Sequence, residues 1–386
     1  SPNRARRLGD VGANGQEHWA WGRTGVEPHV LVMLFARSGG LAAWRERLQD
    51  ADWTEGFTEL ATLPTTDHGE AEPFGFRDGI SQPALDWDRT LPREKLRADY
   101  VNRIALGEVL LGFPNEYGLY TARPLLDPLR EPRARDLPPA EEIADRRDLG
   151  RNGTYLVLRQ LHQDVQGFWR FVHGAADGDA ERREALASAM VGRTREGAPL
   201  VPLRHAWIEG VEGDPDSVRE NHFTYEDDPR GERCPYGAHV RRANPRTGDL
   251  PDATLGPWGR FLRTLGFGRL SFREDLIASA RFHRMLRRGR EYGSELTPEA
   301  ALAEGDHEGE RGLHFIALVG NLSRQFEFVQ AAWMVTPKFA GLADETDPLL
   351  GNREAQFGLE RTDAFTRPRP GRHDERVEGL ARFVTV

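Results

Sequence analysis

Apolar residues in the first third of the chain are spaced as in alternating strands and helices. Val30 to Phe35 is a short apolar run with β-branched members, which is typical of a buried strand. Leu41 to Leu48 places Trp44 and Leu48 at helical spacing, and Phe57 to Leu63 has the composition of a second strand. These segments predict a strand, a helix and a strand, which is half of an α+β domain.

The same alternation returns after residue 150. Asn152 to Arg159 predicts a strand, and Leu313 to Val319 predicts a buried strand. Asp164 to Val172 predicts a helix, because its apolar residues follow the i, i+3, i+4, i+7 spacing. Those residues are Val165, Phe168, Trp169 and Val172. Further helices are predicted over Leu186 to Val191 and Leu322 to Met334, the latter with Glu327 inside it.

The span between the two groups is polar and rich in proline. Such a composition is typical of a connection rather than of a folded unit. We therefore expect an α+β protein with a first domain over residues 1–121, a connection over 122–149 and a second domain over 150–386.

Charge and cysteine content narrow the function classes. A formal net charge of -9 disfavours a broad nucleic-acid interface or binding to an anionic membrane surface. The longest apolar runs are too short to span a bilayer. The single cysteine, Cys234, excludes an intramolecular disulfide framework and a covalent Cys-x-x-Cys-His haem attachment, and it favours a reducing compartment such as the cytoplasm.

One histidine stands in an arginine-rich turn from Glu232 to Arg246. His239 follows a Cys-Pro turn and a small Gly-Ala pair, and Arg241 and Arg246 come shortly after it. An imidazole can ligate haem iron, and nearby cations suit the haem propionates. Two alternatives stay open from these residues alone: an ordinary loop histidine, and a Cys234 thiolate as the ligand.

Two further stretches carry candidate chemistry. Gly75 and Gly79 flank Asp78 in a turn where the backbone can approach a ligand closely, although Asp-Gly turns are common in loops. The basic run Arg284 to Arg290 is either a solvated charge run or part of a site.

Six ordered segments then carry a family resemblance. They are Gly75 to Gly79, Gly107 to Pro114, Asn152 to Arg159, Ala238 to Arg246, Met285 to Gly289 and Gln325 to Gln330. The first matches the Gly-x-x-Asp-Gly fingerprint of the dye-decolourising peroxidases, and the fourth is similar to their proximal-histidine segment. The resemblance implies two ferredoxin-like domains and a non-covalent haem b (iron protoporphyrin IX). Members normally have another strand-helix-strand segment before the region that begins here at Ser1, which implies that the first domain is N-terminally incomplete.

The resemblance also implies roles for residues. His239 would ligate the iron, with Asp78 and Arg287 on the opposite side of the haem. Arg287 rather than Arg288 matches the family's functional arginine. Glu327 is the expected carboxylate partner of His239, with another acidic residue as the alternative.

The implied reaction is the reduction of hydrogen peroxide through a ferryl state and the oxidation of dyes, phenolics or similar donors. Asp78 would serve as the acid/base and Arg287 would stabilise charge, with activity weighted to acidic pH. The alternative is a haem carrier, sensor or cargo protein with little turnover, and a homo-oligomer is left open.

Two smaller hypotheses concern electron donors. Bulky donors could deliver electrons through oxidisable side chains, although core packing explains each of them equally well. The candidates are Trp169, Trp207, Trp258, Trp333, Tyr236 and Tyr292. The acidic run Glu226 to Asp228 has hard oxygen ligands for Mn(II), with a solvated loop as the simpler reading.

Overall fold

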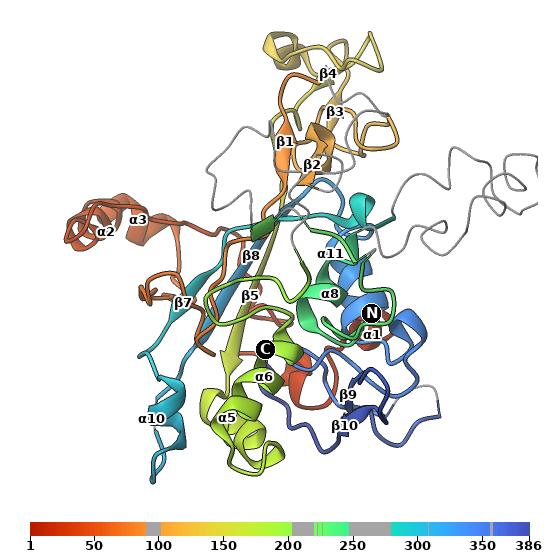
Figure 1. The fold of residues 1–386 in the computed structure, drawn as a ribbon. Coiled ribbons are helices and arrows are strands. Elements are labelled where there is room, and N and C mark those ends of the chain that lie inside the picture. Colours follow the sequence, from red (N-terminus) through yellow and green to blue (C-terminus); the bar gives the residue numbers. More distant parts are fainter. Residues whose placement is uncertain are drawn as a thin grey trace, which may run out of the picture.

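The structure is a computed structural model. Its central element is an antiparallel sheet. The structure describes residues 1–89, 102–202, 220–221, 223–225, 227–246, 279–307, 309–355 and 358–386. Within these, β5 (Tyr155–Gln163) and β8 (Gly312–Val319) pair antiparallel, with Tyr155 opposite Val319 and His162 opposite Gly312. The sheet order is β11-β5-β8-β6, and β7 also pairs with β8 (Figure 1).

The remaining elements surround this sheet. The other strands are β1 (Ala84–Asp86), β2 (Arg103–Ala105), β3 (Leu125–Leu126), β4 (Arg147–Asp148), β6 (Leu286–Arg287), β7 (Arg290–Tyr292), β9 (Phe365–Arg367), β10 (Glu375–Val377) and β11 (Val384–Thr385). The α-helices are α1 (Pro2–Leu8), α2 (Leu41–Leu48), α3 (Ala51–Gly56), α5 (Val165–Ala175), α6 (Ala180–Val191), α8 (His239–Ala243), α10 (Pro298–Leu302) and α11 (Phe326–Phe328), which continues into the π-helix η9 (Val329–Met334). Helices α2 and α3 project away from the main body, whereas α8, α11 and α1 lie together on one side of the sheet (Figure 1).

Helix α5 supplies the centre of the core. Its four predicted apolar residues each have 0% of their surface exposed, which confirms the predicted helix and its inward face. Phe74 and Phe76, from the first predicted domain, are also buried in this cluster. Asp164 caps the helix by accepting a hydrogen bond from the Gly167 N–H at 2.8 Å. The core therefore joins chain segments about ninety residues apart.

Several other predicted elements are confirmed. The strands over β5 and β8, and the helices over α2 and α6, lie where the apolar spacing placed them. Antiparallel strands with separate packed helices confirm the α+β fold class. The domain boundaries at residues 121 and 150 stay a prediction, although β3 and β4 form an antiparallel pair inside the expected connection.

The two strands predicted near the N-terminus are wrong. Neither Val30 to Phe35 nor Phe57 to Leu63 is in a strand, and Val30 and Phe35 have 56% and 80% of their surface exposed. A strand forms only where another strand satisfies its backbone groups, and no neighbour in the described part of the chain does so here. Apolar composition alone could not show that.

The helix predicted over Leu322 to Met334 is shorter and wider than expected. Regular α-helix covers only Phe326 to Phe328, and the following turn is π-helical, with the Val335 N–H bonded to the Gln330 carbonyl at 3.0 Å. This π-helix packs against α8, the helix that begins with His239. Such turns are uncommon and are often found beside functional sites.

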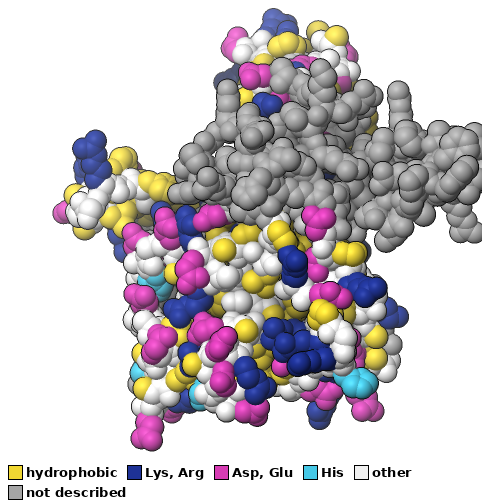
Figure 2. Space-filling view, viewed as in Figure 1, with side chains coloured by type: hydrophobic (Ala, Val, Ile, Leu, Met, Phe, Trp, Pro, Cys, Tyr) yellow, Lys and Arg dark blue, Asp and Glu magenta, His cyan; other side chains and the backbone are white. Residues whose placement is uncertain are grey.

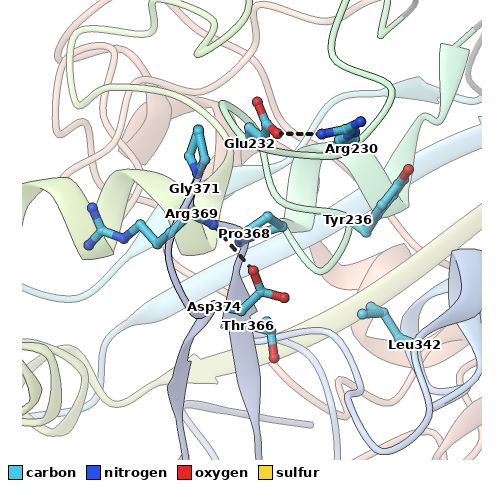
Figure 3. A pocket seen from close by; sticks show the side chains of 10 residues that line it. Arg230, Glu232, Tyr236, Leu342, Thr366, Pro368, Arg369, Gly371 and Asp374 are labelled. Carbon is cyan, nitrogen blue, oxygen red and sulfur yellow. Dashed lines mark hydrogen bonds and ion pairs between the residues drawn. The ribbon is translucent and has the colours of Figure 1, made fainter.

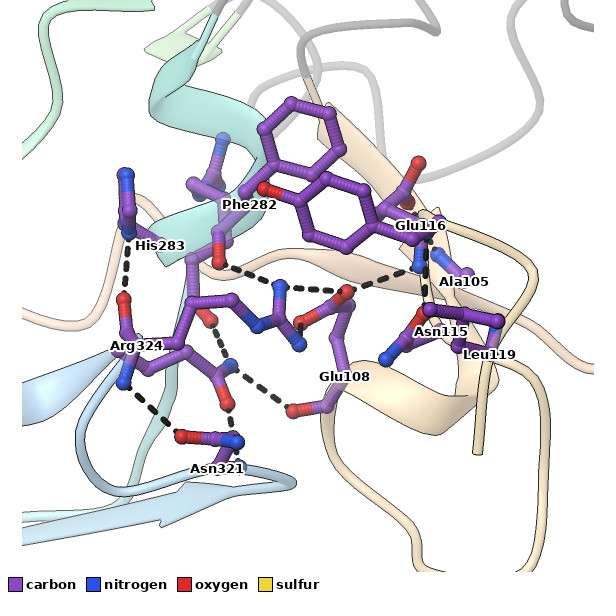
Figure 4. A network of polar contacts seen from close by, with 12 residues as sticks. Ala105, Glu108, Asn115, Glu116, Leu119, Phe282, His283, Asn321 and Arg324 are labelled. Carbon is purple, nitrogen blue, oxygen red and sulfur yellow. Dashed lines mark hydrogen bonds and ion pairs between the residues drawn. The ribbon is translucent and has the colours of Figure 1, made fainter. Parts of the chain in front are cut away.

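A buried polar network joins two of the segments that carry the family resemblance. Arg324 donates to both carboxylate oxygens of Glu108 at 3.0 and 2.7 Å, and Glu108 is fully buried. Gln325 donates to the Glu108 carbonyl at 2.9 Å and to the Arg284 carbonyl at 2.5 Å. Figure 4 shows Glu108 and Arg324 within this network. The network fixes the start of α11 against the Gly107 to Pro114 turn and against the strand that carries Arg287.

Candidate haem site

His239 is the first residue of α8 and one of its ring nitrogens is already engaged. Its Nδ1 lies 3.0 Å from Oδ2 of Asp347. The His239 side chain is 24% exposed, whereas that of Asp347 is fully buried. No hydrogen bond to Nε2 occurs among the described residues, so this nitrogen is the one available to a ligand. A carboxylate on the second nitrogen fixes the tautomer and orientation of a metal-binding imidazole.

The carboxylate partner of His239 is therefore Asp347, and the prediction that Glu327 accepts this hydrogen bond is wrong. Glu327 instead forms an ion pair with Arg4 of α1. The Asp347 carboxylate is held by the backbone N–H groups of Leu349 and Leu350, at 2.9 and 2.8 Å. These bonds come from a turn in the segment after η9, which sequence spacing did not connect with the histidine. The acidic run Asp344 to Asp347 was the only sequence signal.

The two partners shift each other's pKa. Burial alone would lower the pKa of His239, but the adjacent Asp347 carboxylate outweighs it and the pKa is raised. Burial would raise the pKa of Asp347, yet His239 and the nearby Arg242 hold it below its usual range. Asp347 is thus an anion that polarises the imidazole.

Asp78 is presented by a tight hairpin. Ala71 bridges Arg77, and the Glu72 N–H donates to the Phe76 carbonyl at 2.9 Å. Gly75 sits at φ +90°, which suits glycine in such a turn. The Asp78 N–H donates to the Glu70 carbonyl at 2.9 Å, and its own side chain is exposed. Because Phe74 and Phe76 anchor the hairpin in the core, Asp78 extends from a fixed base.

Arg287 lies against the continuation of the same loop. Its backbone N–H donates to Oε1 of Gln82 at 3.0 Å, and its guanidinium donates to the Ser81 carbonyl at 3.3 Å. After burial and Asp347, the charge of Arg287 lowers the pKa of His239 and that of Asp78 raises it. Arg288 is exposed and points its guanidinium back at the Arg287 carbonyl. That Asp78, Arg287 and His239 face one another across one site stays a prediction.

Arg241 and Arg246 are buried, and their contacts differ. Arg241 donates to Asp228 at 3.0 Å and to the Cys234 carbonyl at 2.6 Å, and its guanidinium lies between the rings of Tyr225 and Tyr236. These contacts fix the turn before His239, and direct contact of Arg241 with a cofactor stays a prediction.

Arg246 belongs to a cluster of buried cations. It donates to the Asn221 and Phe223 carbonyls, while its buried Nε has no hydrogen-bond partner among the described residues. Burial lowers the pKa of Arg246 to about 10. The pKa of Arg284 is lowered to about 9 by burial and, to a smaller extent, by the charges of Arg246 and Arg287. The pKa of Arg193 is also lowered, mainly by burial and to a smaller extent by the charge of Arg287. A cluster of arginines that repel one another fits an anionic group such as a pair of propionates.

Cys234 is a weak candidate for the iron ligand. Burial raises the pKa of its thiol to about 12, and the Asp228 carboxylate adds to that effect. The thiol therefore stays protonated at neutral pH and is a poor metal ligand. His239, in contrast, has a ring nitrogen without a hydrogen-bond partner among the described residues.

The remaining candidates are distributed between core and surface. Trp169 is fully buried and donates to the Phe74 carbonyl, as expected of a packing residue, and Trp333 and Tyr292 are also buried. Trp207, Trp258 and Glu226 lie outside the described residues. Asp228 of the proposed Mn(II) run is engaged by Arg241 and two backbone N–H groups. Among the described residues no group of three or more His, Cys, Asp or Glu side chains is placed to hold a metal ion.

Comparison with known proteins gives the class. No family model matches the chain. A dye-decolorizing peroxidase of Mycetinis scorodonius is 27% identical over 380 residues, which cover 94% of this chain and 62% of that protein. A triple mutant of a decolorizing peroxidase from Auricularia auricula-judae superposes with a TM-score of 0.60 at 22% identity, covering 91% of this chain and 69% of the other. An engineered dye-decolorizing peroxidase, described by its haem pocket, superposes with a TM-score of 0.54 at 24% identity over 84% of this chain and 62% of the other.

The chain is therefore a relative of the dye-decolorizing peroxidases and shares their α+β fold. It spans 62% of the length of the Mycetinis protein. Among the residues that the structure describes, no helix is long and apolar enough to cross a membrane.

Proposed function

We propose that this chain binds haem b non-covalently through Nε2 of His239 and acts as a peroxidase. The observation that carries the proposal is the geometry of His239: one ring nitrogen is fixed by a fully buried carboxylate, and the other has no hydrogen-bond partner among the described residues. The cluster of buried arginines favours an anionic cofactor at this place. Relatives named as dye-decolorizing peroxidases support the same reaction class.

When bound, haem supplies the iron at which a peroxide is bound and reduced. The residues of this chain would transfer the proton, stabilise charge and hold the cofactor. The Asp78 carboxylate would accept a proton from one peroxide oxygen and return it to the other, which would leave as water. Arg287, which stays charged, compensates the negative charge that develops as the O–O bond breaks. Asp347 holds the proton on Nδ1 of His239 and keeps the ring oriented.

The exposed position of Asp78 suits this role. A carboxylate on the surface of a rigid hairpin can meet a small substrate without moving the core, and the hairpin is held by Phe74 and Phe76. The electron donors of the proposed reaction are dyes, phenolics or similar reductants.

The test is reconstitution with haem, followed by oxidation of an anthraquinone dye with hydrogen peroxide at acidic pH. We expect a spectrum of histidine-ligated haem and turnover in the unmodified chain. Asp78→Asn should retain haem and lose turnover. Haem binding without turnover in the unmodified chain would favour a carrier or sensor, and absence of haem binding would overturn the proposal.

A further inference from the structure

A cavity whose lining includes none of His239, Asp78 and Arg287 lies between α6, the loop after it and β9. Its volume is about 440 Å³, within the range of pockets that hold small molecules. Three arginines from three distant segments line it: Arg195, Arg233 and Arg367. In Figure 2 basic side chains gather, with acidic ones among them, on the face where α6 and β9 lie in Figure 1.

Part of the lining of this cavity is apolar. Ala185 and Ala189 are four residues apart on α6 and so share one face of the helix, and Leu200 also lines the cavity. The small alanine side chains leave room above the helix. Ser188 and Thr194 add hydroxyl groups at the edge.

The carboxylates at this cavity have partners of their own. Glu184 pairs with the adjacent Arg183 at 3.1 Å. Glu196 accepts hydrogen bonds from its own backbone N–H and from the Thr194 hydroxyl, and these bonds, together with the charge of Arg195, lower its pKa. Neither carboxylate forms an ion pair with a lining arginine within the described part of the chain.

The arginines, in contrast, are incompletely neutralised. Arg367 lies 3.3 Å from Glu375, but that carboxylate is shared with Arg369. Arg195 reaches Glu299 only at 3.7 Å. Arg233 forms no ion pair with any residue that the structure describes. The lining thus carries three arginines against two carboxylates, in a chain whose net charge is -9.

The pocket on the other side of β9 provides a contrast. It has a volume of about 390 Å³, and its lining includes Thr366 and Pro368, the residues before and after Arg367 in the chain. There Arg230 pairs with Glu232 at 3.7 Å, and the Arg369 N–H donates to Asp374 (Figure 3). Its lining has two arginines and two carboxylates, whereas the lining of the α6 pocket has one arginine more than carboxylates.

We propose that the α6 pocket binds a small planar aromatic anion, one that carries a sulfonate or carboxylate. The anionic group would meet Arg233 and Arg367, whose planar guanidinium groups bind oxyanions through paired hydrogen bonds. The aromatic body would cover Ala185, Ala189 and Leu200. This proposal is independent of the peroxidase activity, because binding requires neither haem nor turnover.

The test uses the full chain without haem and naphthalene-2-sulfonate as the probe, with 2-naphthol as its uncharged match, by calorimetric titration. We expect one sulfonate site, at least about tenfold weaker binding of 2-naphthol, and weaker sulfonate binding as salt is raised. Arg233→Ala and Arg367→Ala should each weaken sulfonate binding by about three- to tenfold, as expected of partly exposed charges. Glu196→Gln should strengthen it slightly.

Two variants serve as matched controls. Arg182→Ala removes an exposed arginine of the same helix that pairs with Asp177, and Arg230→Ala removes one from the other pocket. Both should leave affinity unchanged. Equal binding of sulfonate and naphthol, or equal effects of Arg233→Ala and the controls, would overturn the proposal. Thermal unfolding of each variant separates loss of the site from loss of the fold.

Discussion

The two sides of the proposed haem site are built differently. On the histidine side, formed by His239 and Asp347, the carboxylate is fully buried and held by two backbone N–H groups. On the hairpin side, formed by Asp78 and Arg287, the aspartate is exposed, and the arginine donates to the Ser81 carbonyl and to the side-chain oxygen of Gln82. One side is preorganised to hold a ligand, and the other is left accessible to a substrate. Holding the cofactor and moving protons should therefore be separable by mutation.

The largest effect is expected on the histidine side. His239→Ala removes the only proposed iron ligand, so haem retention and turnover should both be lost. Titration with haem, followed in the visible absorption spectrum, measures this. Cys234→Ala is the control and should retain histidine-type spectra, because its buried thiol is protonated. Loss of the spectrum in Cys234→Ala but not in His239→Ala would reverse the ligand assignment.

A variant on the hairpin side should show the opposite pattern. Arg287→Leu should keep haem and lower kcat/KM for peroxide by about 10²- to 10³-fold, the usual effect of removing one charge-stabilising donor. Arg288→Leu is the matched control, since that side chain is exposed, and should stay within about twofold. Stopped-flow mixing with peroxide distinguishes them. Equal losses in both variants would mean that the run acts only as a general positive field.

A smaller effect is expected from the partner of His239. Asp347→Asn removes the anion but keeps a hydrogen-bond acceptor, and we expect haem affinity to fall by about 10- to 100-fold. Glu327→Gln should have almost no effect, because Glu327 pairs with Arg4 and not with His239. Competition with apomyoglobin for haem gives both affinities. A larger loss in Glu327→Gln would restore the sequence-based assignment.

The smallest effect concerns pH and the hairpin. Glu72 accepts hydrogen bonds from the Phe74 and Phe76 N–H groups and from Gln163, and burial raises its pKa from 4.5 to about 7. The folded state therefore keeps a proton that the unfolded chain releases above pH 4.5. Stability should fall as pH rises from about 4.5 to 7, since the folded state binds more protons across this window. Thermal unfolding of the unmodified chain and of Glu72→Gln measures it, and the variant should lose this dependence.

Much of the second half of the chain was predictable from local pattern. The spacing of Val165, Phe168, Trp169 and Val172 gave α5 and its buried face, because an amphipathic helix next to a sheet needs no distant information to be recognised. Asp78, Arg287 and His239 were found through the resemblance of short motifs. The strand predicted over Val30 to Phe35 was wrong for the opposite reason. Its apolar composition suits a strand, but strand pairing depends on a neighbouring strand that composition does not specify.

The sequence by itself determined the fold class, the central strands and helices of the sheet, and which three side chains carry the proposed chemistry. Only the tertiary structure showed which carboxylate is hydrogen-bonded to His239. Asp347 lies 108 residues away from it in the chain, in a turn whose backbone N–H groups orient the carboxylate. No local spacing connects two such residues, because the contact arises from the packing of α8 against the segment after the π-helix. The excess of arginines over carboxylates in the α6 pocket likewise depends on the tertiary structure, because distant segments line the pocket and the nearby carboxylates pair with other residues.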